Sequence, residues 1–227
     1  KDKVSIDFAL KLNKILLVAA FIFLIPSGLL NIILAGTLYG IWGVLYNLKP
    51  FEYKQNPLMG LLINFAAGLI LFTIGWNLNG AVSIDALYLS LPYLLCFSAV
   101  SILTAIPDVK GDSKIQKKTF PIKFGERPTI FFAMIAVLIA FVMGVANNDP
   151  VISTASLVSL PFYIFNLFSL KLNNVLRTIR FSIFNLAFFL MSVFPFLFLA
   201  LGINFYLIKY YYWHRFDIHY ISFLIDE

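Results

Sequence analysis

The sequence predicts an all-α fold, an integral membrane bundle of seven spanning helices. Its 227 residues are 61% hydrophobic and only 12% charged, and the mean hydropathy is +0.90. Soluble domains carry about 25% charged residues, so this chain has too much apolar surface to bury in a water-soluble globule. The apolar residues also occur in long runs, each close to the roughly 17–25 residues that a membrane-spanning helix needs.

Polar stretches that contain proline, glycine and asparagine separate the apolar runs and set the ends of the expected helices. Pro26 and Gly28 end the first helix, and the segment 147–150 separates the fifth from the sixth. Ser5 or Asp7 is the expected N-cap at the start of the first helix. The seven expected spans are residues 8–25, 29–46, 58–76, 84–105, 129–146, 151–170 and 181–208.

The basic residues test this topology, because a correct count of spans sorts them to one side of the membrane. With alternating spans, fifteen Lys and Arg residues fall on one side and only Lys209 and Arg215 on the other. The positive-inside rule then places the fifteen in the cytoplasm. The C-terminal tail is expected on the outside, with Tyr210–Trp213 as an aromatic belt at the headgroups. The net charge of +6 is explained by membrane loops and does not indicate a nucleic-acid partner.

One loop, residues 106–125, concentrates charges of both signs. Asp108 and Asp112 are four positions apart, and side chains with this spacing share one face of a helical turn. Adjacent carboxylates repel each other unless a cation lies between them. Mg²⁺ suits such a pair, because it is usually held by one or two carboxylates and completes its shell with water and substrate phosphate. The loop therefore predicts a Mg²⁺–diphosphate site; the alternative is a solvated loop whose acids neutralise neighbouring lysines.

The same loop resembles a known motif. Asp108-Val-Lys-Gly111-Asp112, with Lys118-Thr119-Phe120-Pro121 and Phe124-Gly125 after it, is similar to the second aspartate-rich motif of the UbiA family of intramembrane aromatic prenyltransferases. That motif reads roughly DxEGD, a spacer, K/R-T-x-x-V/I and x-G. The resemblance implies that Asp108 and Asp112 are the catalytic metal ligands and that Lys118 binds the diphosphate. Lys110 stands where the family often has Glu. Ser113 stands where it often has Arg, so Lys114 is the candidate to supply that charge to the diphosphate.

A second polar loop, from Tyr46 to Lys54, resembles the family's YS-x-x-P-x-R-L-K stretch. Tyr46, Pro50 and Lys54 fit this pattern, while Asn47 replaces Ser and Tyr53 replaces Leu. The resemblance implies that Lys54 and Lys49 bind the diphosphate; the alternative is that they are ordinary loop lysines that contact lipid headgroups.

Three further residues are expected to line the substrate cavity. Asn64 is polar within an apolar span, so it either faces that cavity or makes a hydrogen bond between helices. Tyr39 and Tyr46, with Trp42, are candidates to stabilise an allylic cation through their ring faces, or they only pack helices together.

The resemblance also implies an arrangement of nine helices, of which the first span here corresponds to the third. Residues 1–227 are then expected to form a single transmembrane prenyltransferase domain without its first two helices and its first aspartate-rich motif. Asp2 and Asp7 do not match the spacing of that first motif, so no metal is assigned to them.

Together these features predict Mg²⁺-dependent transfer of a prenyl group from an isoprenoid diphosphate to a lipid-soluble, aromatic acceptor. A CDP-alcohol phosphatidyltransferase is one alternative, but it would need a DG-x-x-A-R stretch that the sequence lacks. A transporter would place charges deep inside the spans, and a non-catalytic scaffold would not bind a prenyl diphosphate with Mg²⁺. Cys96, in an apolar run, is predicted to be a small buried apolar side chain. His214 and His219 are predicted to be surface residues of an interfacial tail.

Overall fold

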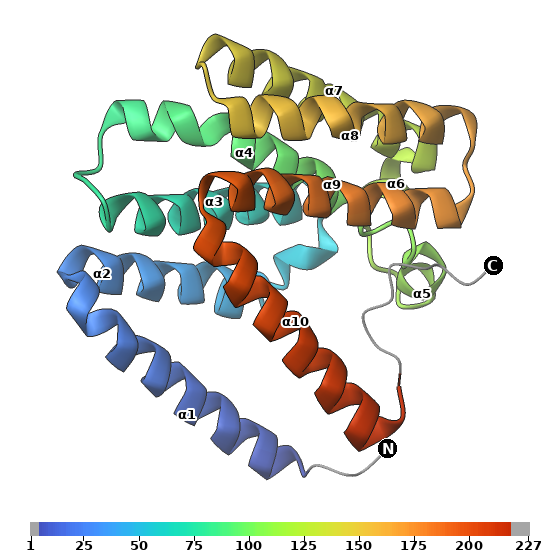
Figure 1. Cartoon of the computed structure of the whole chain (residues 1–227). Coiled ribbons are helices and arrows are strands. Elements are labelled where there is room, and N and C mark those ends of the chain that lie inside the picture. The colour runs from blue at the N-terminus through green and yellow to red at the C-terminus, as the bar shows by residue number, and fades with distance from the viewer. Residues whose placement is uncertain (1–4, 219–227) are drawn as a thin grey trace.

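The computed structural model describes residues 5–218, and every regular element in that range is a helix (Figure 1). An all-α fold is therefore confirmed. The long helices are α1 (Ile6–Leu24), α2 (Leu29–Leu38), α3 (Pro57–Asn77), α4 (Ile84–Leu103), α7 (Glu126–Ala146), α8 (Pro150–Phe168), α9 (Leu172–Val193) and α10 (Pro195–Phe216). The short ones are η1 (Ile25–Ser27), η2 (Tyr39–Leu45), η3 (Tyr53–Gln55), α5 (Val109–Lys114) and α6 (Phe120–Phe124).

Six helices among the described residues are long and apolar enough to cross a membrane: α1 with η1, α3, α4, α7, α8 and α9. The second expected span is a shorter apolar helix, Leu29–Leu45, whose last part, η2, is a π-helix. The starts of several helices follow simple capping chemistry. Ser5 caps α1, as expected, and Asn56 and Asp149 accept hydrogen bonds from the first N–H groups of α3 and α8.

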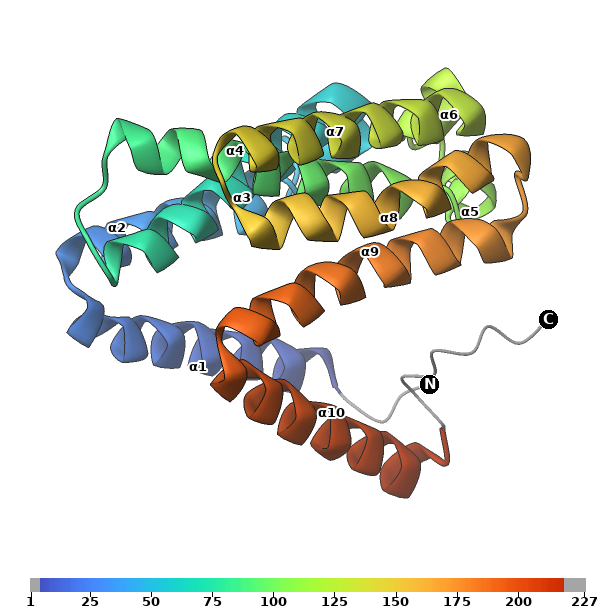
Figure 2. The same cartoon turned by 45° about the horizontal axis from the view of Figure 1, so that its top comes forward.

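Consecutive helices run antiparallel, so the chain has two opposite ends in Figures 1 and 2. At one end, named the polar end, lie the loop before α3, the helices α5 and α6, and the start of α9. At the other, named the far end, lie the turns between α3 and α4 and between α7 and α8. Both expected site loops, residues 46–56 and 106–125, are at the polar end.

The core is formed where α4, α7, α8 and α9 pack together. Small residues allow close approach of the helices: a Cβ at Gly144 would meet the Ile152 side chain at 2.8 Å. Polar side chains also join neighbouring helices, since buried groups without partners are costly in a membrane. Asn166 of α8 donates to the Thr178 hydroxyl of α9, and Asn185 of α9 donates to Ser159 of α8.

The seventh expected span, residues 181–208, is wrong, because the chain breaks at Phe194 into two helices. Pro195 follows the break, and a residue before proline is driven out of the helical region; Phe194 has φ −121° and ψ 78°. The first of the two helices, α9, begins at Leu172 and not at residue 181. The second, α10, turns back from the far end (Figure 2).

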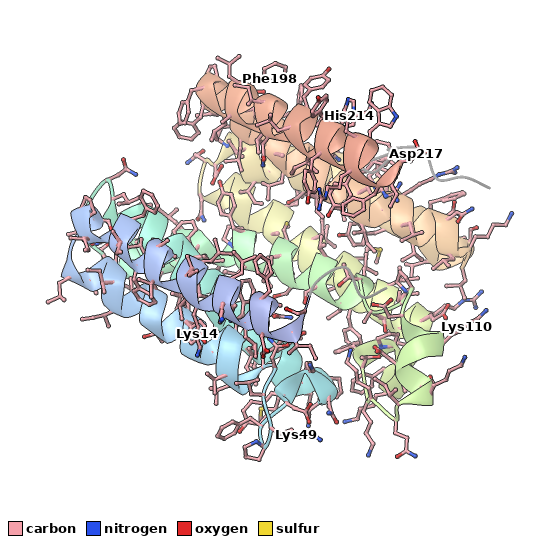
Figure 3. The ribbon with its side chains drawn as sticks, turned by 90° about the horizontal axis from the view of Figure 1, so that it is seen from below. Lys14, Lys49, Lys110, Phe198, His214 and Asp217 are labelled. Carbon is pink, nitrogen blue, oxygen red and sulfur yellow. The ribbon has the colours of Figure 1, made fainter. Side chains whose placement is uncertain are left out.

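This turn also corrects the expected position of the C-terminal segment. The helix α10 runs from the far end back toward the polar end (Figure 1), and Lys209 and Arg215 belong to its second half. His214 and Asp217 are likewise further toward Lys110 than Phe198 is (Figure 3). The aromatic residues Tyr210–Trp213 belong to this returning half of α10, and His219 lies outside the described residues. In the corrected topology Lys209 and Arg215 are therefore no longer on the side opposite the loop 106–125.

Candidate functional site: a polar pocket and an apolar pocket beside helix α4

A pocket of about 220 Å³, which we name the polar pocket, opens at the polar end between α3, the end of α4 and the segment 108–120. It brings together residues from both loops that were singled out in the sequence. Its lining residues are Tyr46, Lys54, Asn56, Pro57, Gly60, Leu61, Asn64, Ser101, Ile102, Thr104, Ala105, Asp108, Asp112, Lys117, Thr119 and Phe120.

The two aspartates of the loop line this pocket together. Asp108 is the residue that precedes α5, and Asp112 lies one turn later, with its N–H donating to the Asp108 carbonyl at 2.8 Å. This helical turn puts both carboxylates on the wall of the same pocket, as their spacing predicts. The Asp112 side chain is 12% exposed, whereas Asp108 is exposed and its carboxylate caps no helix N–H.

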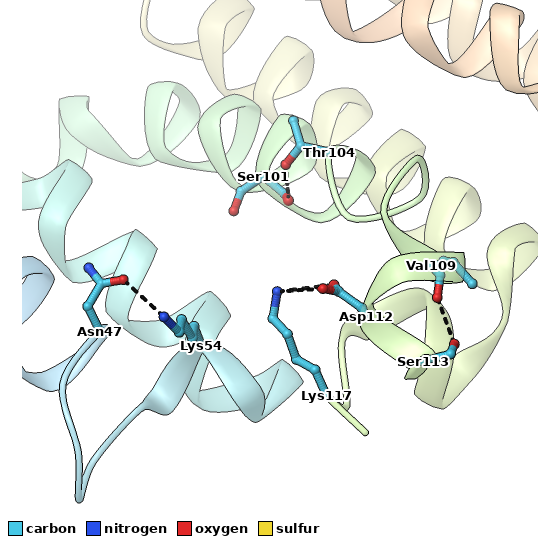
Figure 4. Close-up of polar contacts among 8 residues, drawn as sticks. All are labelled: Asn47, Lys54, Ser101, Thr104, Val109, Asp112, Ser113 and Lys117. Carbon is cyan, nitrogen blue, oxygen red and sulfur yellow. Dashed lines mark hydrogen bonds and ion pairs between the residues drawn. The ribbon is translucent and has the colours of Figure 1, made fainter. Parts of the chain in front are cut away.

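Two lysines reach this pocket from opposite sides (Figure 4). The Nζ atom of Lys117 lies 3.0 and 3.2 Å from the two carboxylate oxygens of Asp112, so the two side chains form an ion pair. From the α3 side, Lys54 Nζ lies 3.5 Å from the Asn47 amide oxygen. The pocket therefore holds two carboxylates and two ammonium groups.

Residues 117–119, which have no regular secondary structure, form one wall of the pocket. Lys117 and Thr119 line the pocket, while Lys118 between them does not. The Lys118 N–H donates to the Gln55 carbonyl at 3.3 Å and ties the segment to the loop before α3. Thr119 is only 6% exposed, and its hydroxyl has no hydrogen-bond partner among the residues that the structure describes.

Asn64 both lines the pocket and joins three helical segments. Its oxygen accepts from Trp42 Nε1 at 3.0 Å, and its amide nitrogen donates to Ser101 Oγ at 2.8 Å. Trp42 lies in the π-helix η2, and such segments frequently occur at functional sites. The two interpretations of Asn64 from the sequence, a cavity residue and a link between helices, thus describe the same side chain.

Not every residue expected at the site lies there. Asp108, Asp112, Lys54, Tyr46 and Asn64 line the polar pocket. Lys49, Lys114, Lys118 and Tyr39 do not, and all four are exposed.

Sequence reasoning missed Lys117, Thr119, Ser101 and Thr104, which do line the pocket. Ser101 and Thr104 lie three positions apart, on one face of a helix, directly before the loop that carries the aspartates. That placement is a signal that could have found them.

A second pocket, about 420 Å³ in volume, lies between α4, α7, α8 and α9, and we name it the apolar pocket. Cys96, Phe97 and Val100 of α4 form one wall, while Ser101 and Thr104 of the same helix line the polar pocket. The remaining lining residues are Val137, Ile152, Ala155, Ser156, Ser159, Tyr163, Ser182, Ile183, Leu186, Ala187 and Leu190.

The donor set of the polar pocket fits a hard divalent cation. Two carboxylates one helical turn apart can hold Mg²⁺, which takes its other ligands from water and from substrate phosphate. Among residues 5–218 no cluster of three or more His, Cys, Asp or Glu side chains is present. A metal here would therefore be held by the Asp108–Asp112 pair with ligands from outside this part of the chain.

Comparison with known proteins identifies a family and two relatives of this chain. The UbiA prenyltransferase family matches residues 1–193, up to the end of α9. Digeranylgeranylglyceryl phosphate synthase of Methanobrevibacter smithii is 28% identical over 145 residues, which are 60% of this chain and 50% of that protein. The chloroplastic 2-acyl-4-prenylphloroglucinol 6-prenyltransferase of Humulus lupulus is 29% identical over 106 residues, which are 40% of this chain and 24% of that protein.

The chain spans half the length of the first relative and about a quarter of the second. No solved structure matches it. The family match covers well over half of the chain and includes both loops that form the polar pocket. The protein is a multi-pass integral membrane protein and belongs to the UbiA prenyltransferase family.

Proposed function

We propose that the protein transfers a prenyl group from an isoprenoid diphosphate to a lipid-soluble acceptor inside the membrane, and that the polar pocket binds the diphosphate. The observation that carries the proposal is the meeting of Asp108, Asp112, Lys54 and Lys117 in one pocket at the end of a membrane bundle. The family match and the names of both relatives favour prenyl transfer over the phosphatidyltransferase and transporter alternatives.

The polar pocket has the groups that a leaving diphosphate needs. Asp108 and Asp112 would hold Mg²⁺, which when bound supplies Lewis-acid stabilisation of the phosphate oxygens. Lys54 and Lys117 place ammonium groups where negative charge grows as the carbon–oxygen bond breaks. Thr119 brings a buried hydroxyl that has no partner among residues 5–218, so it can donate to a phosphate oxygen.

The apolar pocket offers a place for the hydrocarbon part of the substrate. It lies on the other side of α4, and its wall is almost wholly apolar. A prenyl diphosphate has one highly charged end and one hydrocarbon end, and adjacent polar and apolar pockets in a membrane suit both. Because the basic residues gather at the polar end, we further propose that this end faces the cytoplasm.

The proposed acceptor is a lipid-soluble aromatic compound, with a glyceryl phosphate lipid as the second candidate. One relative is named for a prenylphloroglucinol and the other for a glyceryl phosphate. An assay with one acceptor of each kind and a radiolabelled prenyl diphosphate distinguishes them.

The aspartate pair gives the direct test of the function. Asp108→Asn and Asp112→Asn keep the shape of the side chains but remove the charges that hold the metal. Each should lower Mg²⁺-dependent prenyl transfer by about 10²-fold or more, the size of effect seen when charge stabilisation is removed from an active site. The matched control is Asp85→Asn, an exposed aspartate in the first turn of α4 at the far end. Unchanged turnover in both site variants would refute the proposed function.

A further inference from the structure

The ion pair between Lys117 and Asp112 occupies the place that a metal would need. Both carboxylate oxygens of Asp112 face the same ammonium group, at 3.0 and 3.2 Å. A magnesium ion bound to this carboxylate would lie about 2.0–2.1 Å from an oxygen, which brings it close to the Lys117 charge. Two cations at such a distance repel strongly in a partly shielded site. Lys117 and a metal therefore compete for Asp112.

The backbone around Lys117 is held in place, whereas its side chain can move. The Lys117 N–H donates to the Asp112 carbonyl at 3.0 Å, and the next residue, Lys118, is tied to Gln55. A lysine side chain is a compact charge on a flexible four-carbon stem. Its ammonium group can thus leave Asp112 for another anion in the same pocket without any movement of the main chain.

The same wall of the pocket carries a second polar group, a hydroxyl, that a ligand could contact. Thr119 follows Lys117 by two positions, lines the same pocket, and carries a buried hydroxyl without a partner in the described part of the chain. Buried polar groups are normally satisfied, so an oxygen-rich ligand that accepts from Thr119 would lie within the reach of Lys117 as well.

We propose that Lys117 is an exchangeable counter-ion: it neutralises Asp112 in the empty pocket and transfers its contact to a phosphate oxygen when metal and diphosphate bind together. This inference rests on the proposed diphosphate site. Its consequence is that metal alone binds poorly, because Lys117 must leave Asp112 without gaining a new partner. Metal and diphosphate together bind well, because the diphosphate provides that partner.

Binding measurements with Lys117→Met test the exchange without any assay of turnover. The purified protein in lipid nanodiscs is titrated calorimetrically, first with Mg²⁺ alone and then with inorganic diphosphate at saturating Mg²⁺. Loss of the ammonium group should tighten Mg²⁺ binding roughly fivefold, which corresponds to a half-shielded ion pair. It should weaken diphosphate binding by about tenfold or more, since a charge-assisted hydrogen bond is lost. Opposite signs in the two titrations are the signature of the exchange.

Two further variants make the result decisive. Lys110→Met removes the same charge from an exposed position of α5 outside the pocket, so both affinities should change less than about twofold. Lys117→Arg keeps a positive charge and can hold a carboxylate with two parallel hydrogen bonds, so it should weaken binding of Mg²⁺ alone. If Lys117→Met fails to fold, Lys117→Arg still tests the exchange.

The outcomes separate this inference from the function on which it rests. If the wild-type protein does not bind diphosphate with Mg²⁺, the proposed function fails and the exchange fails with it. If the wild type binds but Lys117→Met leaves the affinity for Mg²⁺ alone unchanged, Lys117 is only a phosphate ligand and the exchange is refuted. If Lys117→Met weakens both titrations, the ion pair is structural, and the exchange is again refuted.

Discussion

The two pockets beside α4 differ in how their polar groups are satisfied. In the apolar pocket, the polar groups of the wall have partners: Ser182 donates to the Tyr163 hydroxyl at 3.2 Å, Cys96 lies 3.4 Å from the Ser156 oxygen, and Ser159 accepts from Asn185. In the polar pocket, the buried hydroxyl of Thr119 has no partner, and among the described residues no cation pairs with Asp108. A ligand in the apolar pocket would therefore meet carbon atoms, whereas a ligand in the polar pocket would meet polar groups that still lack a partner.

This difference indicates which pocket binds which part of a ligand. A polar group inside a membrane protein is expensive unless it has a partner, so the pairs in the apolar pocket allow a hydrocarbon to enter without stranding a donor. The unpartnered groups of the polar pocket have the opposite consequence, since only a polar ligand can satisfy them. Substitutions that remove these features one at a time should therefore affect different parts of substrate binding, and the polar pocket should be the more sensitive of the two.

Thr119→Val removes an unpartnered hydroxyl from the polar pocket and so tests the difference between the two pockets. Valine has nearly the shape of threonine but no hydroxyl, so the diphosphate loses one donor. The KM for the prenyl diphosphate should rise by about 10- to 100-fold, the range for loss of a hydrogen bond to a charged group. Competition by inorganic diphosphate should weaken by the same factor.

Thr119→Ser is the matched control because it restores the hydroxyl with a smaller side chain. It should keep a KM within a few fold of the wild type. Equal losses in the valine and serine variants would show that Thr119 acts through packing and not as a donor.

Ala155→Phe tests the apolar pocket by filling it. Ala155 lines this pocket and is only 3% exposed. The larger ring should lower kcat/KM for a prenyl diphosphate with a long tail by about tenfold, within the range for loss of a few methylene groups from an apolar pocket. A five-carbon donor should be affected much less. Val158→Phe, at an exposed position of the same helix, should behave as the wild type with both donors.

An equal loss with the short and the long donor would place the hydrocarbon tail outside the apolar pocket. It would leave the polar pocket as the diphosphate site, because none of the residues changed in this test lines that pocket.

The sequence predicts the bundle better than it predicts its last helices. Long apolar runs determine α1, α3, α4, α7 and α8, because only a helix satisfies its own backbone in a membrane. The break at Phe194 lies within a continuous apolar run, and the arginines Arg177 and Arg180 made the start of α9 resemble a loop. Hydropathy reports the length of an apolar run but not where a proline divides it.

The candidate site shows the same division between local and long-range information. The spacing of Asp108 and Asp112 predicts their shared wall, since helical periodicity is local. Which of Lys117 and Lys118 lines the pocket depends on the path of the chain after α5, where the Lys118 N–H donates to the Gln55 carbonyl, more than sixty positions away. The motif resemblance pointed to Lys118 because that lysine directly precedes Thr119 in the K/R-T pattern.

The smallest expected effect on the reaction comes from the paired groups of the apolar pocket. Ser159→Ala removes the acceptor of the Asn185 amide, a hydrogen bond of 3.1 Å that joins α8 to α9. An interhelical hydrogen bond in a membrane protein contributes about 0.6 kcal/mol on average, and a stranded buried donor raises the cost to roughly 1–2 kcal/mol. We expect that decrease in the free energy of unfolding, measured by denaturant titration in mixed micelles, with kcat/KM for prenyl transfer unchanged. Ser192→Ala, which alters an exposed hydroxyl bonded to its own helix, should change neither quantity. A large loss of turnover in Ser159→Ala at full stability would mean that this hydroxyl contacts the substrate, and the apolar pocket would then not be a surface of carbon alone.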